Sequence, residues 1–493
     1  MSAAALPSPP MLRRFAWTRP GELAAVLLFA AVLRCAMLLV PITHHPDEIY
    51  QYWEPAHRLL TGDGIVAWEW REGIRGWLLP TLLAVPMALG RWIGFSAELL
   101  LPRLTVIALS LTIVHTAWRL GAARSREHAL VASIAAACWY SLLCFAPRTL
   151  SEPVATALLF PAALWLADPA SSPRRLGAAG ALLALAIVAR PHYAPAAAVL
   201  ALVALGRRLP RAATALVLGA MLALAAGGLA DMAQGQQPLA WIANNVLVNV
   251  IQDRASGFGV EPPSFYLSRW LHAWSWWTPV VLAGLMLGWR ASPALAAAAV
   301  VNLIVHMLIG HKEPRFIFFS EAAVIVLAAI GTVEIGRRLR LGWPTVAAFW
   351  IAASVLLAFK GDERFLWRAG RPGHLATQAL RSDPQACGLA LVDTSYTDVP
   401  GRSHLPPGLP VAQFARSDPA MGGRAPAVAF GPYAPAFNRV LTKAETRLPG
   451  YRDVLCANDH WDRLCLRARP GGCTARPDAD RWSMQVAMRR SGH

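Results

Sequence analysis

The chain has 493 residues, of which 56% are hydrophobic and 15% charged, and its formal net charge is +17. Ordinary globular chains carry about 25% charged residues, so this composition argues against a soluble protein, rules out a disordered chain, collagen and a small disulfide scaffold, and indicates a polytopic membrane protein. Almost all the basic residues are arginines in short clusters between apolar runs. That pattern fits membrane topology better than nucleic-acid binding.

The apolar runs set the expected topology. A spanning helix needs about 20 mostly apolar residues, and about eleven segments qualify or nearly qualify. They are 21–41, 101–119, 129–146, 153–168, 176–190, 193–206, 212–230, 273–289, 293–310, 316–334 and 343–359. If these runs alternate across the membrane, every arginine cluster falls on one side, which the positive-inside rule makes cytoplasmic. The clusters lie at 13–19, 119–126, 174–175, 207–211, 290 and 337–340.

This topology leaves three long segments on the external side: 42–100, 231–272 and 361–493. The apolar stretch 74–93 would, as a span, place the cluster at 119–126 outside, so we predict a helix lying in the membrane interface instead. We therefore expect an all-α membrane domain over 1–360, followed by an external C-terminal domain of α/β or mixed type over 361–493.

The cysteines agree with this sidedness. Three of them lie in or near apolar runs, where cysteine usually acts as a small hydrophobe: Cys35, Cys138 and Cys144. The other four lie in the C-terminal segment: Cys387, Cys456, Cys465 and Cys473. Because an external compartment is oxidising, we predict one or two disulfides there. The spacing fits no zinc site.

The first external loop concentrates polar side chains directly after the first apolar run. It opens with His44, His45, Pro46, Asp47 and Glu48. Two carboxylates beside two imidazoles suit a general base or a metal site, whereas a helix cap would explain Asp47 alone. The same loop mixes acidic and aromatic side chains: Glu54, Asp63, Glu69, Glu72, Tyr50, Tyr52, Trp53, Trp68, Trp70 and Trp77. This mixture favours a sugar site, where rings stack on C–H faces and acids bind hydroxyls.

Three further polar groups are predicted at the same membrane face. They are Arg148 with Ser151 and Glu152, Arg190 with His192, and the run of His311, Lys312, Glu313 and Arg315 around Pro314. Snorkelling to lipid headgroups would explain Arg148 or Arg190 alone, but a simple turn does not require the run that ends at Arg315. Arginine, lysine and histidine around one spot suit a phosphate or pyrophosphate.

These motifs resemble a known family. The segments 45–48 (HPDE), 51–54 (QYWE), 68–70 (WEW) and 73–80 (GIRGWLLP) are similar to the first lumenal loop of glycosyltransferase family 22, and 311–316 (HKEPRF) is similar to its second signature. The family comprises polyprenol-phosphate-mannose-dependent mannosyltransferases of N-glycan and GPI-anchor assembly, with bacterial relatives. The resemblance covers about 42–335.

The resemblance implies a GT-C fold and an inverting transfer of mannose from a polyprenyl phosphate to a glycan or glycolipid acceptor, with no metal or other cofactor. It also implies that Asp47 is the general base, and Glu48 is the neighbouring catalytic candidate. The candidates for holding the donor phosphate are Arg190, His311, Lys312 and Arg315. The remaining substrate-binding candidates are His45, Glu69, Trp70, Arg75, Glu152 and Glu313. The expected location is a bacterial inner membrane with the site facing the periplasm, or the endoplasmic reticulum membrane in a eukaryote.

Three other interpretations compete with this one. A transporter or flippase would use buried charges along a substrate path, but the polar groups here lie at one face and no inverted repeat is visible. A GT-C transferase for another lipid-linked sugar, such as arabinose, would keep the mechanism and change the donor. A non-catalytic membrane scaffold is the third.

Overall fold

The computed structural model describes residues 20–43, 45–206, 210–394, 398, 401–459 and 462–492. His44 and the arginines Arg13, Arg14, Arg19, Arg207 and Arg208 lie outside the described residues. The α-helices of the larger, N-terminal part are α1 (Pro20–Ala36), α2 (Glu54–Thr61), α3 (Trp68–Arg71), α4 (Leu78–Ile93), α5 (Phe95–Ala122), α6 (Arg126–Cys138), α7 (Tyr140–Phe145), α8 (Ser151–Ala167), α9 (Pro173–Ala189), α10 (Ala194–Leu205), α11 (Pro210–Ala233), α12 (Ala240–Val246), α13 (Phe265–Trp274), α14 (Thr278–Gly288), α15 (Pro293–Leu308), α16 (Phe318–Arg338) and α17 (Trp343–Ala358).

Local sequence explains where several of these helices begin. Ser125, Ser172 and Ser292 precede α6, α9 and α15, and each hydroxyl accepts a hydrogen bond from a backbone N–H in the first turn. Serine is a favoured helix cap because it satisfies one of the free N–H groups there. Pro173 and Pro293 follow at the first helical position, where a missing N–H costs nothing.

Long apolar helices confirm a membrane protein. Within the described ranges, four helices are long and apolar enough to span a bilayer: Pro20–Leu39, Phe95–Ala122, Ala213–Ala233 and Pro314–Arg338. The pair Trp343–Ala358 and Gly361–Arg381, bent by 86°, would add a fifth. Shorter apolar helices are Leu78–Ile93, Ser151–Ala167, Pro191–Leu205, Ala240–Ile251 and Pro293–Leu308. The predicted count of about eleven spans is therefore not confirmed and stays a prediction, as does the interfacial position of 74–93.

Glycines let two helix pairs approach closely. A Cβ added at Gly180 of α9 would lie 1.9 Å from the carbonyl oxygen of Leu216 in α11. In the second pair, a Cβ at Gly331 of α16 would lie 1.8 Å from the carbonyl oxygen of Gly284 in α14. Small residues at helix contacts allow the backbone-to-backbone packing that stabilises helices in lipid.

Three of the predicted cytoplasmic arginines, from two different clusters, lie at one end of the helical bundle. Arg126 lies 2.8 Å from Glu22 at the start of α1, and Arg337 at the end of α16 lies 2.9 Å from Glu127. Arg124 donates to the carbonyl of Leu287 near the end of α14. This grouping is what alternating helices require. Which side of the membrane it faces stays a prediction.

The C-terminal domain is built around a five-stranded sheet with the order β2-β1-β3-β5-β4. Its elements are β1 (Leu389–Val392), β2 (Val411–Phe414), β3 (Arg439–Lys443), β4 (Arg452–Asn458), β5 (Arg463–Ala468), α18 (Arg371–Arg381), α19 (Pro426–Phe430), α20 (Ala479–Trp482) and α21 (Met484–Arg490). Strand β1 is parallel to β2 and β3, whereas β5 is antiparallel to β3 and β4. The expected mixed fold is confirmed, and both disulfides form: Cys387–Cys473 and Cys456–Cys465.

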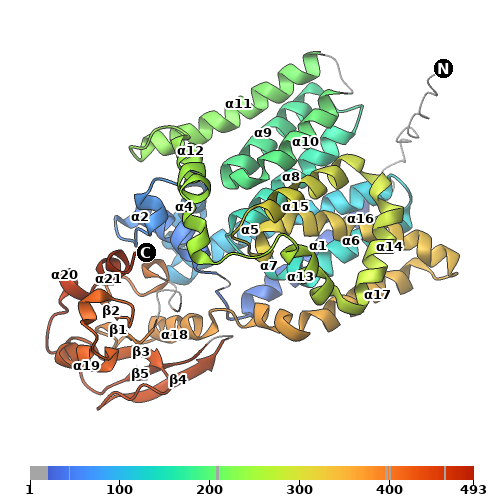
Figure 1. Ribbon diagram of the computed structural model, residues 1–493. Coiled ribbons are helices and arrows are strands. Elements are labelled where there is room, and N and C mark those ends of the chain that lie inside the picture. The colour runs from blue at the N-terminus through green and yellow to red at the C-terminus, as the bar shows by residue number, and fades with distance from the viewer. Residues whose placement is uncertain are drawn as a thin grey trace, which may run out of the picture.

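The sheet domain packs beside α2 at one end of the bundle (Figure 1). Glu54, at the start of α2, is fully buried and accepts hydrogen bonds from the backbone N–H groups of Ile65 (2.6 Å) and Ser403 (2.7 Å). Arg402 also pairs with Asp63 at 2.9 Å. The C-terminal domain therefore helps to hold the first loop, which carries the HPDE motif.

Candidate active site

Asp47 points into a charged cluster and caps no helix. It precedes η2 (Glu48–Trp53), a π-helical turn that runs into α2, and its side chain makes no capping hydrogen bond. Instead, one carboxylate oxygen lies 2.6 Å from Nη2 of Arg315, and the other lies 3.4 Å from Nδ1 of His45. π-Helical turns are rare and are frequently found at functional sites. The cap interpretation of Asp47 therefore loses its support.

Glu48 faces a different part of the protein. Its side chain is buried, and its carboxylate accepts a hydrogen bond of 3.1 Å from the backbone N–H of Thr149. Because successive residues of a helical turn point in different directions, the two adjacent carboxylates separate. Glu48 joins the first loop to the segment between α7 and α8.

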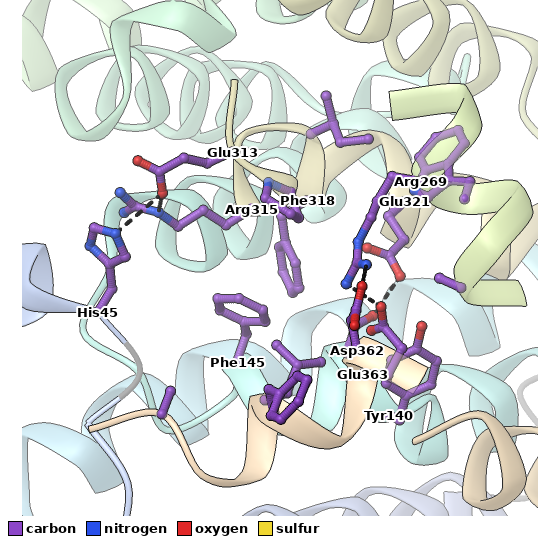
Figure 2. Close-up of a pocket in the computed structure, with 18 of the residues that line it drawn as sticks. His45, Tyr140, Phe145, Arg269, Glu313, Arg315, Phe318, Glu321, Asp362 and Glu363 are labelled. Carbon is purple, nitrogen blue, oxygen red and sulfur yellow. Dashed lines mark hydrogen bonds and ion pairs between the residues drawn. The ribbon is translucent and has the colours of Figure 1, made fainter. Parts of the chain in front are cut away.

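Arg315 is the centre of the cluster. It lies in η8 (Pro314–Ile317), a 3-10 turn at the start of α16, and its side chain is almost fully buried. Besides Asp47, it contacts Glu313 at 2.6 Å and Glu152 at 3.2 Å. Figure 2 shows Arg315 and Glu313 next to His45, whose ring lies 3.4 Å from Glu313. One guanidinium thus binds a neighbouring carboxylate, Glu313, and two carboxylates from distant segments of the chain, Asp47 and Glu152.

Glu152 joins a second arginine to this cluster. It lies in the first turn of α8 and is fully buried, 3.3 Å from Arg190, which follows the end of α9. Arg190 also stacks its guanidinium over the ring of Phe316, 4.5 Å from the ring centroid. The structure therefore brings together six of the predicted site residues: His45, Asp47, Glu152, Arg190, Glu313 and Arg315.

Glu69, Trp70 and Arg75 form a neighbouring wall. Glu69 accepts a hydrogen bond of 3.0 Å from Gln51, and its carboxylate lies 3.9 Å from Arg75. Trp70 donates to the backbone carbonyl of Tyr50 at 3.1 Å. Glu69 lies close enough to Asp47 for the two charges to interact, so a carboxylate and an aromatic ring lie beside the charged cluster, as a sugar site requires.

The two remaining phosphate candidates lie apart from Asp47. The ammonium group of Lys312 donates to the backbone carbonyls of Glu261 (2.8 Å), Ile309 (2.5 Å) and Gly310 (3.3 Å). His311 bonds the carbonyl of Gly259 at 3.0 Å and Glu313 at 3.3 Å. Both residues thus connect the HKEPRF turn to the long segment before α13.

The cluster shifts the pKa values of its acids in opposite directions. Burial alone would raise the pKa of Asp47, but His45 and Arg315 outweigh it and keep that pKa well below its usual value. The pKa of Glu313 is lowered in the same way, since Arg315 and His45 outweigh burial. Burial raises the pKa of Glu69, although Arg75 opposes this shift. At neutral pH Asp47 is therefore an ionised carboxylate, as a proton acceptor must be.

A cavity of about 590 Å³ adjoins this cluster. One end is lined by His45, Glu313 and Arg315, and Figure 2 shows Phe145 and Phe318 between this end and a second polar group. The second group comprises Tyr140, Ser141, Arg269, Glu321, Asp362 and Glu363. None of these residues was predicted from the sequence. Glu321 could have been noticed there, because an acid inside the apolar run 316–334 is costly and usually functional.

Comparison with known proteins identifies the family. Residues 25–362 match the Alg9-like mannosyltransferase family. The chain is 28% identical to GPI mannosyltransferase 3 of Yarrowia lipolytica over 416 residues, which cover 80% of this chain and 78% of that protein. It is 27% identical to GPI alpha-1,2-mannosyltransferase 3 of Bos taurus over 319 residues, 60% of this chain and 57% of the bovine protein. The chain thus spans little more than half the length of the bovine relative.

Solved structures show the fold. The crystal structure of ArnT from Cupriavidus metallidurans bound to undecaprenyl phosphate superposes with a TM-score of 0.56 at 13% sequence identity, covering 91% of this chain and 98% of ArnT. Its apo structure gives 0.55 at 14% identity, covering 90% and 98%. ArnT is a GT-C enzyme, so the GT-C fold implied by the motifs is confirmed. The match over 25–362 shows that the chain belongs to the Alg9-like mannosyltransferase family.

Proposed function

We propose that this protein transfers a mannosyl residue from a polyprenyl-phosphate carrier to a hydroxyl group of a glycan or glycolipid, at the external membrane face and with inversion at the anomeric carbon. The observation that carries the proposal is the 2.6 Å contact between Asp47 and Arg315. This contact supports the proposal because it joins the carboxylate that we assign as proton acceptor to the guanidinium that we assign to the donor phosphate. The mannosyltransferase relatives and the carrier lipid bound to ArnT support the choice of substrates.

The chemistry follows from these two groups. Asp47 accepts the proton of the acceptor hydroxyl while its oxygen forms a bond to the anomeric carbon from the face opposite the phosphate. The bond between that carbon and the phosphate oxygen breaks, and its electron pair stays on the departing polyprenyl phosphate. Because the phosphate leaves as an anion, it requires cations rather than an acid, and Arg315 and Arg190 supply them.

The charge balance of the cluster requires an exchange of partners. The carboxylates of Asp47, Glu152 and Glu313 already surround Arg315. A donor phosphate must therefore replace a carboxylate at this guanidinium. The side chains of Asp47 and Glu313 are 24% and 23% exposed, whereas that of Glu152 is 0% exposed, so Asp47 and Glu313 are more easily displaced than Glu152. Release from Arg315 would raise the pKa of Asp47 toward its usual range and make it a better base once the donor is bound.

A donor-consumption assay in membranes tests this proposal. Membranes containing the protein are incubated with polyprenyl-phosphate mannose, and the release of polyprenyl phosphate is followed by mass spectrometry. We expect consumption with the wild-type protein and its loss with Asp47→Asn. A matching arm with polyprenyl-phosphate arabinose decides the sugar. If neither donor is consumed by the wild-type protein, the proposal fails.

A further inference from the structure

The far end of the cavity is a second polar site, distinct from the Asp47–Arg315 cluster. The two ends lie on the same segment of chain, because Arg315 and Glu321 are six residues apart, roughly 10 Å along a helix. Figure 2 shows Glu321, Arg269, Glu363 and Tyr140 at this far end, beyond the two phenylalanine rings. The proposed transfer reaction, as described above, uses none of these side chains.

The charges at the far end disfavour a phosphate. Glu321 accepts hydrogen bonds from Ser141 (2.7 Å) and from the indole of Trp139 (3.3 Å). Arg269 bonds Glu363 and lies 3.6 Å from Asp362. This end thus carries three carboxylates against one guanidinium, and two of those carboxylates engage the guanidinium. The guanidinium of Arg269 is thus already engaged by carboxyl groups and is not free to bind a phosphate.

The cavity wall also contains an unused hydrogen-bond donor. Trp274 of α13 lines the cavity and is only 2% exposed. Its indole N–H has no hydrogen-bond partner among the residues that the structure describes. A buried donor without a partner costs free energy, so a ligand that accepts from it gains affinity. Trp274 also stacks on Trp270, with ring centroids 4.8 Å apart and planes at 16°.

These features together match one kind of ligand. Hydroxyl groups both donate and accept hydrogen bonds, so the hydroxyl groups of one ligand can donate to Glu321 and accept from Trp274. The C–H face of a sugar ring can pack on the aromatic rings that line the cavity. A lipid chain would keep water away from the carboxyl groups of Glu321 and Glu363 and would offer them no further hydrogen bond, which costs free energy. The cavity of about 590 Å³ lies within the range of small-molecule sites.

We propose that the far end of this cavity binds the non-reacting saccharide portion of the acceptor, through its neutral hydroxyl groups, while the reacting hydroxyl lies at Asp47. This inference rests on the proposed function, because it names the acceptor side of the same reaction. It assigns Glu321, Ser141 and Trp274 to acceptor recognition and leaves the donor phosphate at Arg315 and Arg190. Glu321, Ser141 and Trp274 act on affinity for the acceptor and not on the bond-making step.

Binding of soluble sugars tests the inference without turnover. The full chain is placed in lipid nanodiscs, and the dissociation constants of methyl α-mannobioside and methyl α-glucosaminide are measured by saturation-transfer NMR. We expect saturable binding of at least one sugar, weakened about tenfold by Glu321→Gln, because the amide replaces one hydrogen-bond-accepting oxygen with an NH₂ donor. Ser141→Ala and Trp274→Phe remove one polar group each. Both variants should fold and should bind the same sugar more weakly than the wild-type protein.

Matched controls separate the possible results. Glu334→Gln makes the same change near the opposite end of α16, away from the cavity lining, and should leave the sugar affinity unchanged. Asp47→Asn should also bind the sugar while losing transfer. Absence of saturable binding for both sugars, or an affinity that Glu321→Gln, Ser141→Ala and Trp274→Phe all leave unchanged, overturns the inference.

Two further outcomes distinguish this inference from the proposed function. If Asp47→Asn abolishes donor consumption but the far-end variants weaken binding of farnesyl phosphate instead of the sugars, the cavity belongs to the donor and the inference fails alone. If the far-end variants weaken sugar binding while the wild-type protein consumes neither donor, the saccharide site stands and the proposed reaction fails.

Discussion

The guanidinium of Arg315 lies 2.6 Å from the carboxylate of Asp47, although the two residues are 268 positions apart in the chain. This contact joins the two motifs that the sequence separates most widely, HPDE and HKEPRF. The positive charge of Arg315 also balances the negative charge of Asp47 until another anion, such as the donor phosphate, binds to the arginine. The predictions below follow from this pair and from the elements that hold it.

Replacing Arg315 should weaken binding of the donor. Arg315→Lys keeps the positive charge but loses the planar fork that bonds several oxygen atoms at once. We expect the KM for polyprenyl-phosphate mannose to rise about tenfold to a hundredfold, because hydrogen bonds to a charged group are lost. Initial rates over a range of donor concentrations measure the change.

Lys312 serves as the matched comparison for this variant. Its ammonium group bonds three backbone carbonyls, so Lys312→Ala should lower protein level or Tm more than donor affinity. A donor KM that rises for Lys312→Ala and stays constant for Arg315→Lys would reverse the two assignments.

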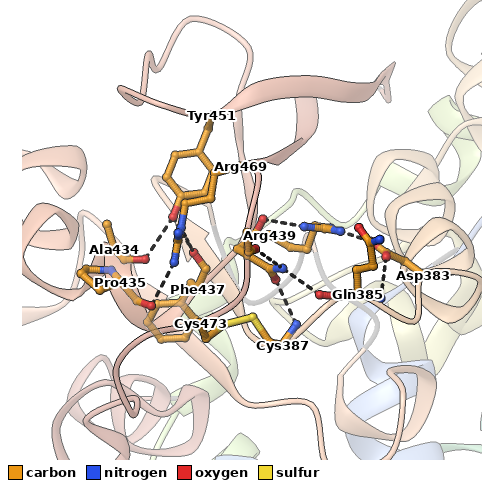
Figure 3. The surroundings of a disulfide bond; sticks show 12 residues. Asp383, Gln385, Cys387, Ala434, Pro435, Phe437, Arg439, Tyr451, Arg469 and Cys473 are labelled. Atoms are coloured by element: carbon orange, nitrogen blue, oxygen red, sulfur yellow. Dashed lines mark hydrogen bonds and ion pairs between the residues drawn. A yellow bond between two sulfur atoms is a disulfide. The ribbon is translucent and has the colours of Figure 1, made fainter.

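The two disulfides should contribute unequally to the stability of the C-terminal domain. The Cys387–Cys473 bond closes a separation of 86 residues, against 9 for Cys456–Cys465. Loop entropy gives about 4–5 kcal/mol for the first bond and about 2–3 kcal/mol for the second. Figure 3 shows Cys387 and Cys473 beside a network that includes Arg439 and Asp383.

Paired serine substitutions measure that difference. In denaturant unfolding, the free energy of unfolding should fall more for the double variant Cys387→Ser with Cys473→Ser than for the double variant Cys456→Ser with Cys465→Ser. Non-reduced peptide mapping should recover both bonds. Equal losses, or four free thiols in the untreated protein, would contradict the assignment.

The contribution of His311 to stability should depend on pH. Its hydrogen bond to Glu313 raises the pKa of His311, although burial opposes this shift. A group whose pKa is raised by folding stabilises the fold below its unfolded pKa, and this stabilisation is lost as the pH rises through the folded value. The Tm difference between the wild-type protein and His311→Gln should therefore be largest in mildly acidic buffer and shrink toward alkaline pH. A difference that grows with pH would refute this.

The predicted topology places the long loops 42–100 and 231–272 on the external side of the membrane and the short loop between α8 and α9 on the cytoplasmic side. Ser264 lies in the segment 231–272, and Ala170 lies between α8 and α9; both are exposed. An impermeant maleimide should label Ser264→Cys in intact cells or sealed vesicles that display the external face. It should label Ala170→Cys only after the membrane is opened. The opposite pattern would place the Asp47 cluster on the cytoplasmic side.

Several features could be predicted from the sequence because they depend on local patterns. Apolar runs predict membrane helices, and the motif at 45–48 predicts the loop that carries Asp47. The spatial relationships are different. The separation of Glu48 from Asp47 depends on a π-helical turn. The role of Lys312 depends in part on the carbonyl of Glu261, 51 residues earlier. The sequence shows that Glu321 lies inside an apolar run, but only the folded structure shows that it contacts Ser141.

The helix count shows the same limit. The apolar runs and the arginine clusters together predict about eleven membrane spans. Several of these runs form helices that are too short to cross a bilayer on their own. Helix length depends on breaks such as Trp139, where the backbone leaves the helical region between α6 and α7. Such breaks depend on tertiary packing, which hydropathy does not record.

The measurement that tests the central claim most directly compares Asp47→Asn with Glu48→Gln in the donor-consumption assay. Asp47→Asn keeps the shape of the side chain and removes the proton acceptor, so kcat should fall about 10²-fold or more while donor KM changes less. Glu48→Gln alters a carboxylate that faces Thr149, so it should reduce protein stability more than kcat. Near-normal turnover by Asp47→Asn, with loss of turnover in folded Glu48→Gln, would contradict the account and move the base by one residue.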